Sequence, residues 1–307
     1  MLPILNLIRY PNLLIIAATQ YVFKYFVVDP MMKASALNDW QFALLVLATI
    51  CIAAAGNIIN DINDVNIDLI NKPKKVIVSK SISESLANNL FIGFNVVGVV
   101  IGLYLSNTVG KNNMAVIFVL ISGLLYIYST SLKKLLLVGN LLVSALVGFS
   151  ILIVGLFEIY PMIDEHNLTA AQWTLKVLAI YALFAFLVNL LREITKDIED
   201  IDGDYGGGMN TLPILLGRER TAKLVAVLGM AVMVVIFLFV YKYLYDKQGV
   251  LSYILLFVFG PLFYFVINSW NAKKKQDFRK LSTVLKVVML FGIFSVIVLY
   301  YAFKETN

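Results

Sequence analysis

Two stretches of the sequence contain acidic residues at intervals that would place them on one side of an α-helix. The first stretch contains Asn57, Asp61, Asp64 and Asp68. Residues three or four apart share a face of an α-helix, and at about 100° per residue these four fall within an arc of roughly 60°. Carboxylate and amide oxygens, without histidine or cysteine, are the ligands that hard cations such as Mg²⁺ prefer. The pattern therefore predicts a magnesium site.

The second stretch repeats this spacing later in the chain. It contains Asn189, Glu193, Asp197, Asp200 and Asp204. These side chains cover an arc of about 80° if the helix continues to Asp204, although Gly203 favours a helix end just before that residue. We expect Asp200 and Asp204 to be the principal members of this group, with Asp197 and Glu193 in support.

Like charges at this spacing repel one another, and partial burial at a membrane increases the repulsion. A solvated acidic face is the alternative for either stretch alone, but two stretches on one side of the membrane favour bound cations. Mg²⁺ commonly takes one or two carboxylates and completes its shell with phosphate oxygens and water. The two stretches together therefore predict a site for a polyphosphate bridged by metal ions. Ca²⁺ fits less well, because neither stretch has a dedicated calcium-loop pattern.

Basic residues accompany both acidic stretches. We expect Lys75, Lys133 and Arg192 to contact a bound diphosphate, because cations must balance both the carboxylates and the phosphates. The alternative for each is topological charge at a membrane surface. The single histidine, His166, lies in a loop on the opposite side and is expected to be solvated, and Cys51 lies in an apolar run and is expected to pack as a small hydrophobe.

An unusually apolar chain carries these residues. Of 307 residues, 60% are hydrophobic and 14% charged, whereas soluble domains have about 45–50% apolar and about 25% charged residues. Long apolar runs in a bilayer favour helices, because backbone polar groups in lipid must be satisfied internally. We predict an all-α integral membrane bundle of nine transmembrane helices with two cytoplasmic Asp-rich motifs. The predicted spans are 11–28, 41–60, 86–106, 114–132, 135–157, 173–191, 221–241, 249–270 and 282–302.

Loop charge predicts the orientation of these helices. Eighteen of the 25 lysines and arginines fall on the side that holds the N-terminus and both acidic stretches, and five fall on the other side. The positive-inside rule places the richer side in the cytoplasm. We therefore expect a multi-pass protein of a prokaryotic plasma membrane whose site faces the cytoplasm. The same bias accounts for the net charge of +6, so we expect no nucleic-acid partner.

Two loops on the cytoplasmic side, 61–85 and 192–220, are long, and each follows an even-numbered helix. This arrangement indicates an internal repeat of the kind that places a site between two related bundles.

Several motifs resemble the UbiA family of intramembrane prenyltransferases. The first signature, within 57–80, is Asn60-Asp61-x-x-Asp64-x-x-x-Asp68 followed by Asn71-Lys72-Pro73. The second, within 189–213, is Asp200-x-x-x-Asp204 followed by Gly208 and Thr211-Leu212-Pro213. Between them, the chain is similar to the family at Tyr126-x-Tyr128-Ser129-x-x-Leu132-Lys133 and Gly139-Asn140. The resemblance covers nearly the whole chain and implies a single membrane domain over 1–307.

The resemblance also implies a reaction. Two Mg²⁺ ions would join the aspartates to the diphosphate of a prenyl donor, and the allylic cation would then react with a lipophilic acceptor. The donor tail would lie among the helices, close to membrane lipid, and the rings of Tyr126 and Tyr128 would stabilise the cation.

The family assigns roles to individual positions of this sequence. The implied metal ligands are Asp61, Asp64, Asp68, Asp197, Asp200 and Asp204. The implied catalytic residues are the same set without Asp197. The implied substrate-binding residues are Asn57, Asn60, Lys75, Lys133, Tyr126, Asn189, Arg192 and Lys196.

Within the family, one segment is most similar to the branch that alkylates geranylgeranylglyceryl phosphate, an ether-lipid precursor. That segment is Arg192-Glu193-Ile-x-Lys196-Asp197-Ile-Glu199-Asp200-x-x-Gly203-Asp204. The expected donor is then geranylgeranyl diphosphate, while aromatic acceptors of quinone biosynthesis remain open. The chain departs from the family at 75–80, where an arginine and a Pro-x-Pro-Ser-Gly stretch are usual, and at Met209 and Asn210, where a lysine-rich pair is usual. These departures concern the pocket and not the metal ligands.

Two hypotheses of other classes compete with the enzyme. A cation or solute transporter needs acids at the depth of the bilayer midplane. In the half of the membrane opposite the two acidic stretches, we expect no matching acids within the spans. A non-catalytic lipid-binding relative has no need of two intact metal signatures.

Overall fold

The computed structural model describes residues 2–304, which fold almost wholly into helices. No strand forms within that range, where a β-bridge joins Val78 to Ile82 in a short loop. The chain forms two compact units. The first comprises Met1–Leu135 and Ser150–Leu178, and the second comprises Leu136–Phe149 and Ala179–Asn307. The prediction of an all-α protein is confirmed.

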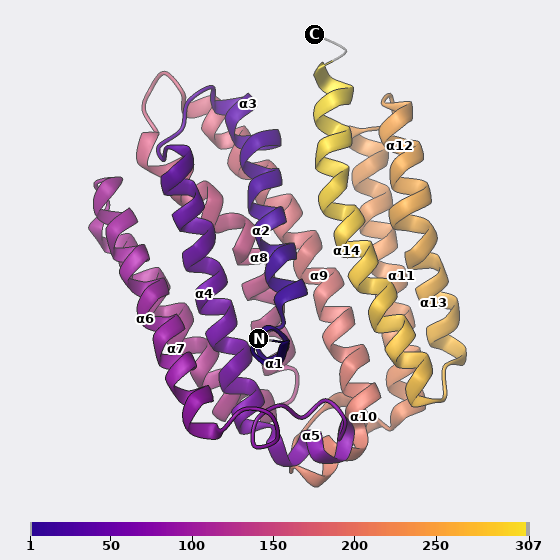
Figure 1. Ribbon diagram of the computed structural model, residues 1–307. Helices are drawn as coiled ribbons and strands as arrows, with labels where there is room; N and C mark the ends of the chain where they lie inside the picture. Colours follow the sequence, from indigo (N-terminus) through magenta and orange to yellow (C-terminus); the bar gives the residue numbers. More distant parts are fainter. Residues whose placement is uncertain (1, 305–307) are drawn as a thin grey trace. The chain divides into compact units, whose positions relative to one another are not determined.

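The first unit is built from the N-terminal helices (Figure 1). They are α1 (Leu2–Leu7), α2 (Tyr10–Phe23), the π-helical η1 (Lys24–Val28), α3 (Asp29–Met32), α4 (Asp39–Asn63), α5 (Val65–Asn71), α6 (Glu84–Thr108) and α7 (Ala115–Thr130). Local sequence sets the starts of the two longest. Asn38 and Gln41 form a capping box at the start of α4, and the Ser83 hydroxyl accepts from the backbone of α6, which satisfies donors that a helix start leaves unpaired.

Two helices, α8 (Val138–Glu158) and α9 (Leu168–Gly206), contribute residues to both units. Three short 3₁₀ turns are η2 (Asn112–Met114), η3 (Leu132–Lys134) and η4 (Tyr160–Met162). The second unit is completed by α10 (Leu212–Leu216), α11 (Arg218–Tyr243), α12 (Gln248–Ile254), the π-helical η5 (Leu255–Phe259), α13 (Gly260–Asn271) and α14 (Lys275–Lys304).

Nine helical segments among residues 2–304 are long and apolar enough to cross a membrane. They correspond one to one with the nine predicted spans, so the chain is a multi-pass membrane protein. The longest helix, α9, has 39 residues and measures about 58 Å at about 1.5 Å per residue. Because the hydrocarbon core of a bilayer is only about 30 Å thick, α9 extends well beyond it and carries the second acidic stretch on its final turns.

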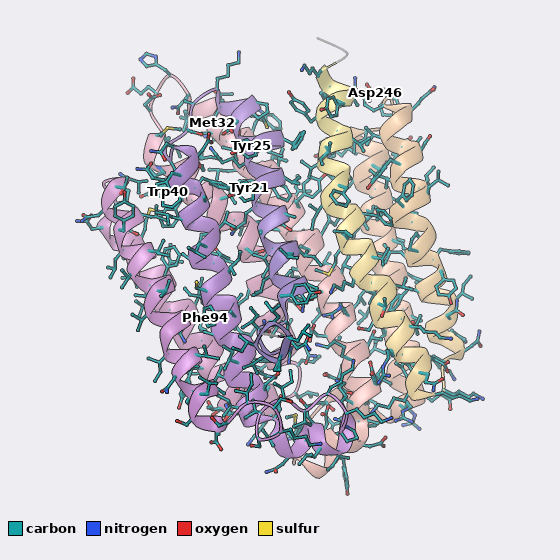
Figure 2. The ribbon with its side chains drawn as sticks, viewed as in Figure 1. Tyr21, Tyr25, Met32, Trp40, Phe94 and Asp246 are labelled. Carbon is teal, nitrogen blue, oxygen red and sulfur yellow. The ribbon has the colours of Figure 1, made fainter. Side chains whose placement is uncertain are left out.

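Aromatic side chains gather near one end of the first unit. The rings of Tyr21 and Tyr25 stack with centroids 6.0 Å apart, and the Tyr25 hydroxyl donates to Asp39 at the start of α4. Trp40 follows and is 70% exposed. Figure 2 shows these aromatic residues and Met32 toward the same end of the unit. Exposed tryptophan and tyrosine at helix ends are typical of a membrane–water interface.

The first acidic stretch is divided between two helices. Helix α4 ends at Asn63 and α5 begins at Val65, with Asp64 between them at φ −97°, ψ 2°. Figure 1 shows α5 running sideways from the end of α4. The prediction that Asp68 continues the helix face of Asp61 and Asp64 is therefore wrong. Six of the nine residues from 60 to 68 are Asn or Asp, and their side chains compete with the helix for backbone hydrogen bonds.

The second acidic stretch stays on one helix. Helix α9 continues through Gly203 and ends at Gly206, so the predicted helical face from Asn189 to Asp204 is confirmed. The turn follows at Gly208, which has φ +66°, a value that glycine adopts without strain.

The two π-helical segments each lie just before a proline. η1 precedes Pro30 and η5 precedes Pro261. Proline lacks a backbone N–H and its ring clashes with the carbonyl four residues earlier, so the preceding turn widens into a π-bulge. Both long spans thereby continue past a proline.

The first unit also buries an ion cluster that we did not predict. Lys24 Nζ lies 3.0 Å from Glu158 Oε1 and 2.9 Å from Asp29 Oδ1, and the Lys24 and Glu158 side chains are 1% and 0% exposed. The expectation was of no matching acids within the predicted spans of the opposite half, and both acids of this cluster lie just outside those predicted spans. Asp29 and Glu158 each fall one residue beyond the predicted ends of their spans, 28 and 157. Because Lys24 forms ion pairs with both acids, the cluster does not favour a transporter over an enzyme.

The second unit has its own apolar core, in which α9 and α14 take part. Val188, Leu191, Ile194 and Ile198 of α9 belong to one buried cluster with Phe278, Leu281, Leu285 and Val288 of α14. Both sets recur every three or four residues, as expected for a helix that buries one stripe. This packing holds the polar residues of α9 in fixed positions along the neighbouring face.

Candidate active site

The Asp64 carboxylate of the first unit accepts hydrogen bonds from two other predicted site residues. Lys133 Nζ donates to Asp64 Oδ1 at 2.5 Å, and Asn60 Nδ2 donates to Asp64 Oδ2 at 2.7 Å. Lys133 also reaches Asn60 Oδ1 at 3.3 Å. The three residues form a closed network in which the Lys133 side chain is only 7% exposed. The structure therefore brings together three of the predicted site residues.

The end of α7 brings Lys133 to this network. Ser129 is buried, donates to the Ile59 carbonyl at 3.0 Å and accepts from Asn63 Nδ2 at 2.8 Å. These bonds join the last turn of α7 to the last turn of α4. Lys133 follows in the short turn η3, four residues later, and so meets Asp64.

Asp61 has a cationic partner that we did not predict. Arg9 Nη2 lies 2.6 Å from Asp61 Oδ1. Arg9 adopts a left-handed backbone conformation, φ 55° and ψ 51°, at the start of α2, which is unfavourable for a non-glycine residue. Asn57 Nδ2 donates to the Ile8 carbonyl at 3.0 Å and thereby fixes the segment that presents Arg9. Asn57 thus acts on the position of Arg9.

Asp68 lies on α5 and remains electrostatically coupled to the other two aspartates. Partial burial raises the pKa of Asp68 above the usual value for aspartate; Lys72 opposes this rise, and Asp64 and Asp61 add to it. The three carboxylates are therefore within electrostatic range of one another, although a helix break separates them. A cation placed among them would relieve their repulsion.

Two predicted residues of the first unit lie outside this network. Lys75 is exposed. Tyr126 is 49% exposed and stacks on Phe91 with ring centroids 6.2 Å apart. Tyr128, two positions along α7, instead lies within electrostatic range of Arg9. Residues two apart on a helix point in different directions, which explains why these two tyrosines have different surroundings.

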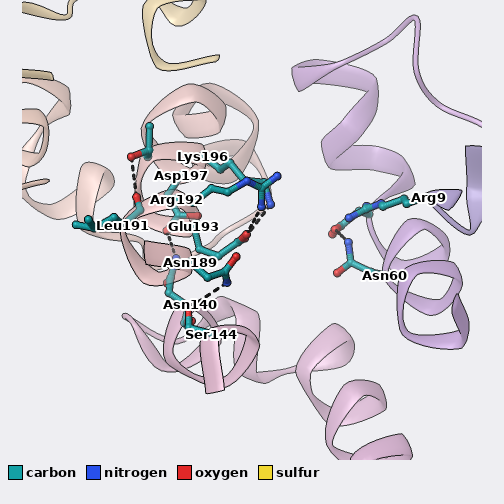
Figure 3. A network of polar contacts seen from close by, with 12 residues as sticks. Arg9, Asn60, Asn140, Ser144, Asn189, Leu191, Arg192, Glu193, Lys196 and Asp197 are labelled. Atoms are coloured by element: carbon teal, nitrogen blue, oxygen red, sulfur yellow. Dashed lines mark hydrogen bonds and ion pairs between the residues drawn. The ribbon is translucent and has the colours of Figure 1, made fainter. Parts of the chain in front are cut away.

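In the second unit, α8 supports the start of the acidic face of α9 (Figure 3). Asn140 Nδ2 donates to Asp197 Oδ2 at 2.8 Å, and Asn189 Nδ2 donates to the Ser144 hydroxyl at 3.2 Å. Asn140 and Ser144 are four residues apart and therefore lie on one face of α8. Asn189 is thus engaged in joining the two helices.

Arg192 and Lys196 share one carboxylate. Arg192 Nη1 donates to Glu193 Oε1 and Lys196 Nζ donates to Glu193 Oε2, both at 2.8 Å, as Figure 3 shows. The predicted substrate-binding cations of α9 and the supporting acid Glu193 therefore form a compact group one to two turns before Asp200.

The last turns of α9 carry the principal acids of the second stretch. Asp200 and Asp204 occur one turn apart on this helix, and Asp204 is buried. Nearby in sequence, Thr211 Oγ1 is buried and has no hydrogen-bond partner within residues 2–304. A buried hydroxyl without a partner is unfavourable by about 1–3 kcal/mol, so it is suited to bond a ligand such as a phosphate.

The chemistry of both groups fits magnesium. Their donors are carboxylate, amide and hydroxyl oxygens, which are hard ligands, and the aspartates within each unit raise one another's affinity for a cation. Within residues 2–304, no three acidic, histidine or cysteine side chains meet closely enough to form a complete metal cage.

A comparison with family models identifies the chain. The model of the UbiA prenyltransferase family matches residues 25–292. The chain belongs to the UbiA prenyltransferase family. It is therefore a membrane prenyltransferase, as the resemblance of its motifs predicted, and the prediction of an enzyme is confirmed.

Curated relatives share a narrower description. The chain is 34% identical over 259 residues to the digeranylgeranylglyceryl phosphate synthase of Methanopyrus kandleri, covering 82% of this chain and 83% of the relative. It is 31% identical over 267 residues to the protein of that description from Korarchaeum cryptofilum, covering 85% and 86%.

Solved UbiA structures share the fold. A UbiA homologue from Aeropyrum pernix superposes with a TM-score of 0.69 at 16% identity, covering 93% of this chain and 97% of that one. A UbiA homologue from Archaeoglobus fulgidus bound to DMAPP and Mg²⁺ superposes with a TM-score of 0.59 at 14% identity, covering 95% and 98%.

Several polar residues of these networks were missing from the sequence prediction. Arg9 is 52 residues from Asp61, and no local periodicity connects the two. Asn140 belongs to a motif that resembles the family, so its position did carry a signal. Arg279 Nε donates to Glu199 Oε1 at 2.9 Å, and the sequence analysis did not single out Arg279.

Proposed function

We propose that this chain transfers a geranylgeranyl group from its diphosphate to geranylgeranylglyceryl phosphate, a lipophilic acceptor, with Mg²⁺ as cofactor. The observation that carries the proposal is the pair of acidic groups, each at the end of a long helix and each with basic side chains nearby. The choice of acceptor is supported by the relatives named digeranylgeranylglyceryl phosphate synthase and by the motif from Arg192 to Asp204. A single functional domain over 1–307 would contain both groups.

The aspartates of the two groups are the proposed metal ligands. They are Asp61, Asp64 and Asp68 in the first unit and Asp197, Asp200 and Asp204 in the second. Magnesium held there supplies Lewis acidity that stabilises the negative charge of the departing diphosphate. Lys133 and Arg9 lie against the first group and are placed to balance phosphate oxygens, while Asn57 and Asn60 hold these cations and Asp64 in position.

The proposed chemistry is a substitution at the allylic carbon of the donor. The bond from this carbon to the diphosphate oxygen breaks, and its electron pair leaves on that oxygen. The acceptor hydroxyl oxygen then forms the new ether bond and loses its proton. The cations and hydroxyl groups that face the diphosphate lower the barrier because they are already oriented toward the charge that develops.

The proposed location follows from loop charge. Loop charge, through the positive-inside rule, supports a cytoplasmic location for both acidic groups, and we propose that the membrane is a prokaryotic plasma membrane. The donor diphosphate would then enter from the cytoplasm, while the isoprenoid tails of donor and acceptor remain in the lipid.

An acceptor screen tests the proposal. Purified protein in nanodiscs is given labelled geranylgeranyl diphosphate, Mg²⁺ and one acceptor at a time, and the products are read by mass. We expect a digeranylgeranyl ether only with geranylgeranylglyceryl phosphate. Transfer to an aromatic quinone precursor instead would replace the proposed acceptor. Proteoliposome uptake of a cation without any transfer product would contradict a prenyltransferase role.

A further inference from the structure

The last two turns of α9 have a sequence that disfavours a helix. Residues 199–206 read Glu-Asp-Ile-Asp-Gly-Asp-Tyr-Gly, of which four are acidic and two are glycine. Glycine is a poor helix former, and acidic side chains are unfavourable near the C-terminal end of a helix, where the macrodipole is itself negative. Helix α9 nevertheless continues to Gly206. Contacts with other parts of the chain must therefore hold these turns in place.

The apolar core of the second unit does not reach these turns. Ile198 is the last residue of α9 in the buried cluster that α9 shares with α14. Beyond it, Ile201 is only partly buried and Tyr205 is 76% exposed. Hydrophobic packing thus holds α9 as far as Ile198, and the turns that carry Asp200 and Asp204 extend past it.

A buried ion pair joins the first of these turns to α14. Arg279 Nε donates to Glu199 Oε1 at 2.9 Å, and the Glu199 side chain is only 7% exposed. A buried carboxylate bonded to a guanidinium is a stronger contact than a pair at the surface. A longer pair joins Arg218 Nη2 to Asp202 Oδ2 at 3.5 Å, but the Asp202 side chain is 70% exposed. The pair with Arg279 is therefore the stronger of the two.

Helix α14 presents Arg279 from a fixed position. Phe278 and Leu281 are 1% and 2% exposed and belong to the buried cluster that includes Ile198. Further along the same two helices, the hydroxyls of Tyr181 and Ser295 lie 2.9 Å apart. Because α14 is packed against α9 over several turns, the ion pair transmits the position of a rigid helix to the end of α9.

Glu199 is placed to act on its neighbours without entering the acidic face. Successive residues of a helix point about 100° apart, so the Glu199 side chain leaves α9 in a different direction from that of Asp200. Asp200 and Asp204 share a face only while the helix between them persists. Contact with Arg279 just before Asp200 therefore keeps the spacing of the two aspartates without using either of them.

We propose that Arg279 is a positioning residue, which acts through Glu199 to keep the last two turns of α9 helical and so holds Asp200 and Asp204 at the spacing that binds Mg²⁺. The inference rests on the proposed function and deepens it, because it adds a residue of α14 to the machinery of the second acidic group. Two aspartates held together before the metal arrives do not have to be ordered by the metal, which favours binding.

Hydrogen exchange tests the structural half of the proposal without substrate. Full-length protein in nanodiscs is measured in the absence of Mg²⁺, and the exchange of residues 199–206 is read by mass. We expect Arg279→Met to speed exchange in this segment about five- to tenfold, the effect of losing one charge-assisted contact on local opening. Residues 181–195, which pack in the apolar core, should exchange as in wild type.

Magnesium dependence tests the functional half. The Mg²⁺ concentration for half-maximal release of pyrophosphate from geranylgeranyl diphosphate should rise about five- to tenfold in Arg279→Met. At saturating Mg²⁺, kcat should stay within about threefold of wild type, because the bound metal then restores the spacing. Arg279→Lys keeps a cation beside Glu199 and should recover most of the Mg²⁺ affinity. Lys280→Met, at the next and exposed position, should behave as wild type in both measurements.

The outcomes separate this inference from the proposed function. Equal exchange of residues 199–206 in wild type and Arg279→Met would overturn the positioning role, whatever the activity. A lower unfolding temperature with unchanged Mg²⁺ dependence would overturn it too, since it would show a purely structural pair. If wild type releases no pyrophosphate with Mg²⁺, the proposed function fails, and the link from Arg279 to magnesium fails with it. If wild type is active and Arg279→Met needs no more Mg²⁺ than wild type, only the positioning role fails.

Discussion

At the scale of single residues, the site consists of carboxylates whose charge is balanced by specific cations. Asp64 is bonded by Lys133 and Asn60, and Asp61 is bonded by Arg9. These cations hold the acids in a charge-compensated arrangement beside which a diphosphate and its metal ions can bind. The side chains that touch the acids are therefore expected to affect the donor more than the acceptor.

Lys133 and its neighbour Lys134 provide a test substitution and a matched control. Lys133→Met removes the ammonium that lies 2.5 Å from Asp64 Oδ1, so kcat/KM for the donor should fall at least about tenfold, in line with about 1.5–3 kcal/mol for a hydrogen bond to a charged group. Lys134→Met, at an exposed position, should leave kcat/KM within about twofold, the variation ordinary for surface changes. Equal effects of the two substitutions on steady-state kinetics with varied donor would contradict the assignment of Lys133.

Sequence analysis predicted these acids and Lys133 because they belong to short, regularly spaced motifs. It did not predict Arg9, because the contact with Asp61 depends on how the segment before α2 folds back onto α4. It included Tyr126, but stacking on Phe91 turns that ring elsewhere, which spacing alone does not reveal. The metal-binding and substrate-binding roles of the predicted residues remain predictions for the variants above.

At the scale of elements, the important departures from a simple helix pattern are the break at Asp64 and the buried ion cluster of the first unit. The break is explained by a local excess of Asn and Asp. This excess is visible in the sequence, but our prediction gave more weight to the helical spacing of the acids. The ion cluster joins η1, α3 and α8, since Lys24 contacts both Asp29 and Glu158. Residues so far apart in the chain cannot be paired from sequence periodicity.

The ion cluster should be structural and not catalytic. Lys24→Met leaves Glu158 buried without its cation and should lower the free energy of unfolding by about 3–5 kcal/mol. The double substitution Lys24→Met with Glu158→Leu removes both charges and should recover most of that loss. Thermal unfolding in detergent measures both. A double variant that is stable yet unable to turn over substrate would contradict a purely structural role.

At the scale of the whole molecule, the nine spans were the most predictable feature. Their number and approximate ends follow from apolar length alone, because a bilayer of about 30 Å requires about 20 apolar residues per helix. Hydropathy alone did not predict the length of α9, since its final turns are polar and fall outside any hydropathy window; the spacing of its acids predicted their helical face. The internal repeat and the side of the membrane that each loop faces remain predictions.

Cysteine labelling tests the orientation. The chain has a single cysteine, Cys51, which is buried, so Cys51→Ala provides a background without thiols. On that background, His166→Cys should react with a membrane-impermeant maleimide in intact cells, and Lys75→Cys should react only after the cells are opened. Both original side chains are exposed. Labelling of Lys75→Cys in intact cells would place the acidic groups on the outer side.

The central claim is that the acidic group of each unit is required, with magnesium, for the release of diphosphate from a prenyl donor. The most direct measurement is release of pyrophosphate from geranylgeranyl diphosphate in the presence of acceptor, for wild type, Asp64→Asn and Asp200→Asn, with Mg²⁺ and with a chelator. We predict that wild type turns over only with Mg²⁺ and that each variant loses at least about 10²-fold in kcat, the scale expected when a group that stabilises the transition state is removed, while unfolding at the same temperature as wild type. Full turnover by wild type in chelator, or by a folded variant lacking either aspartate, would contradict the account.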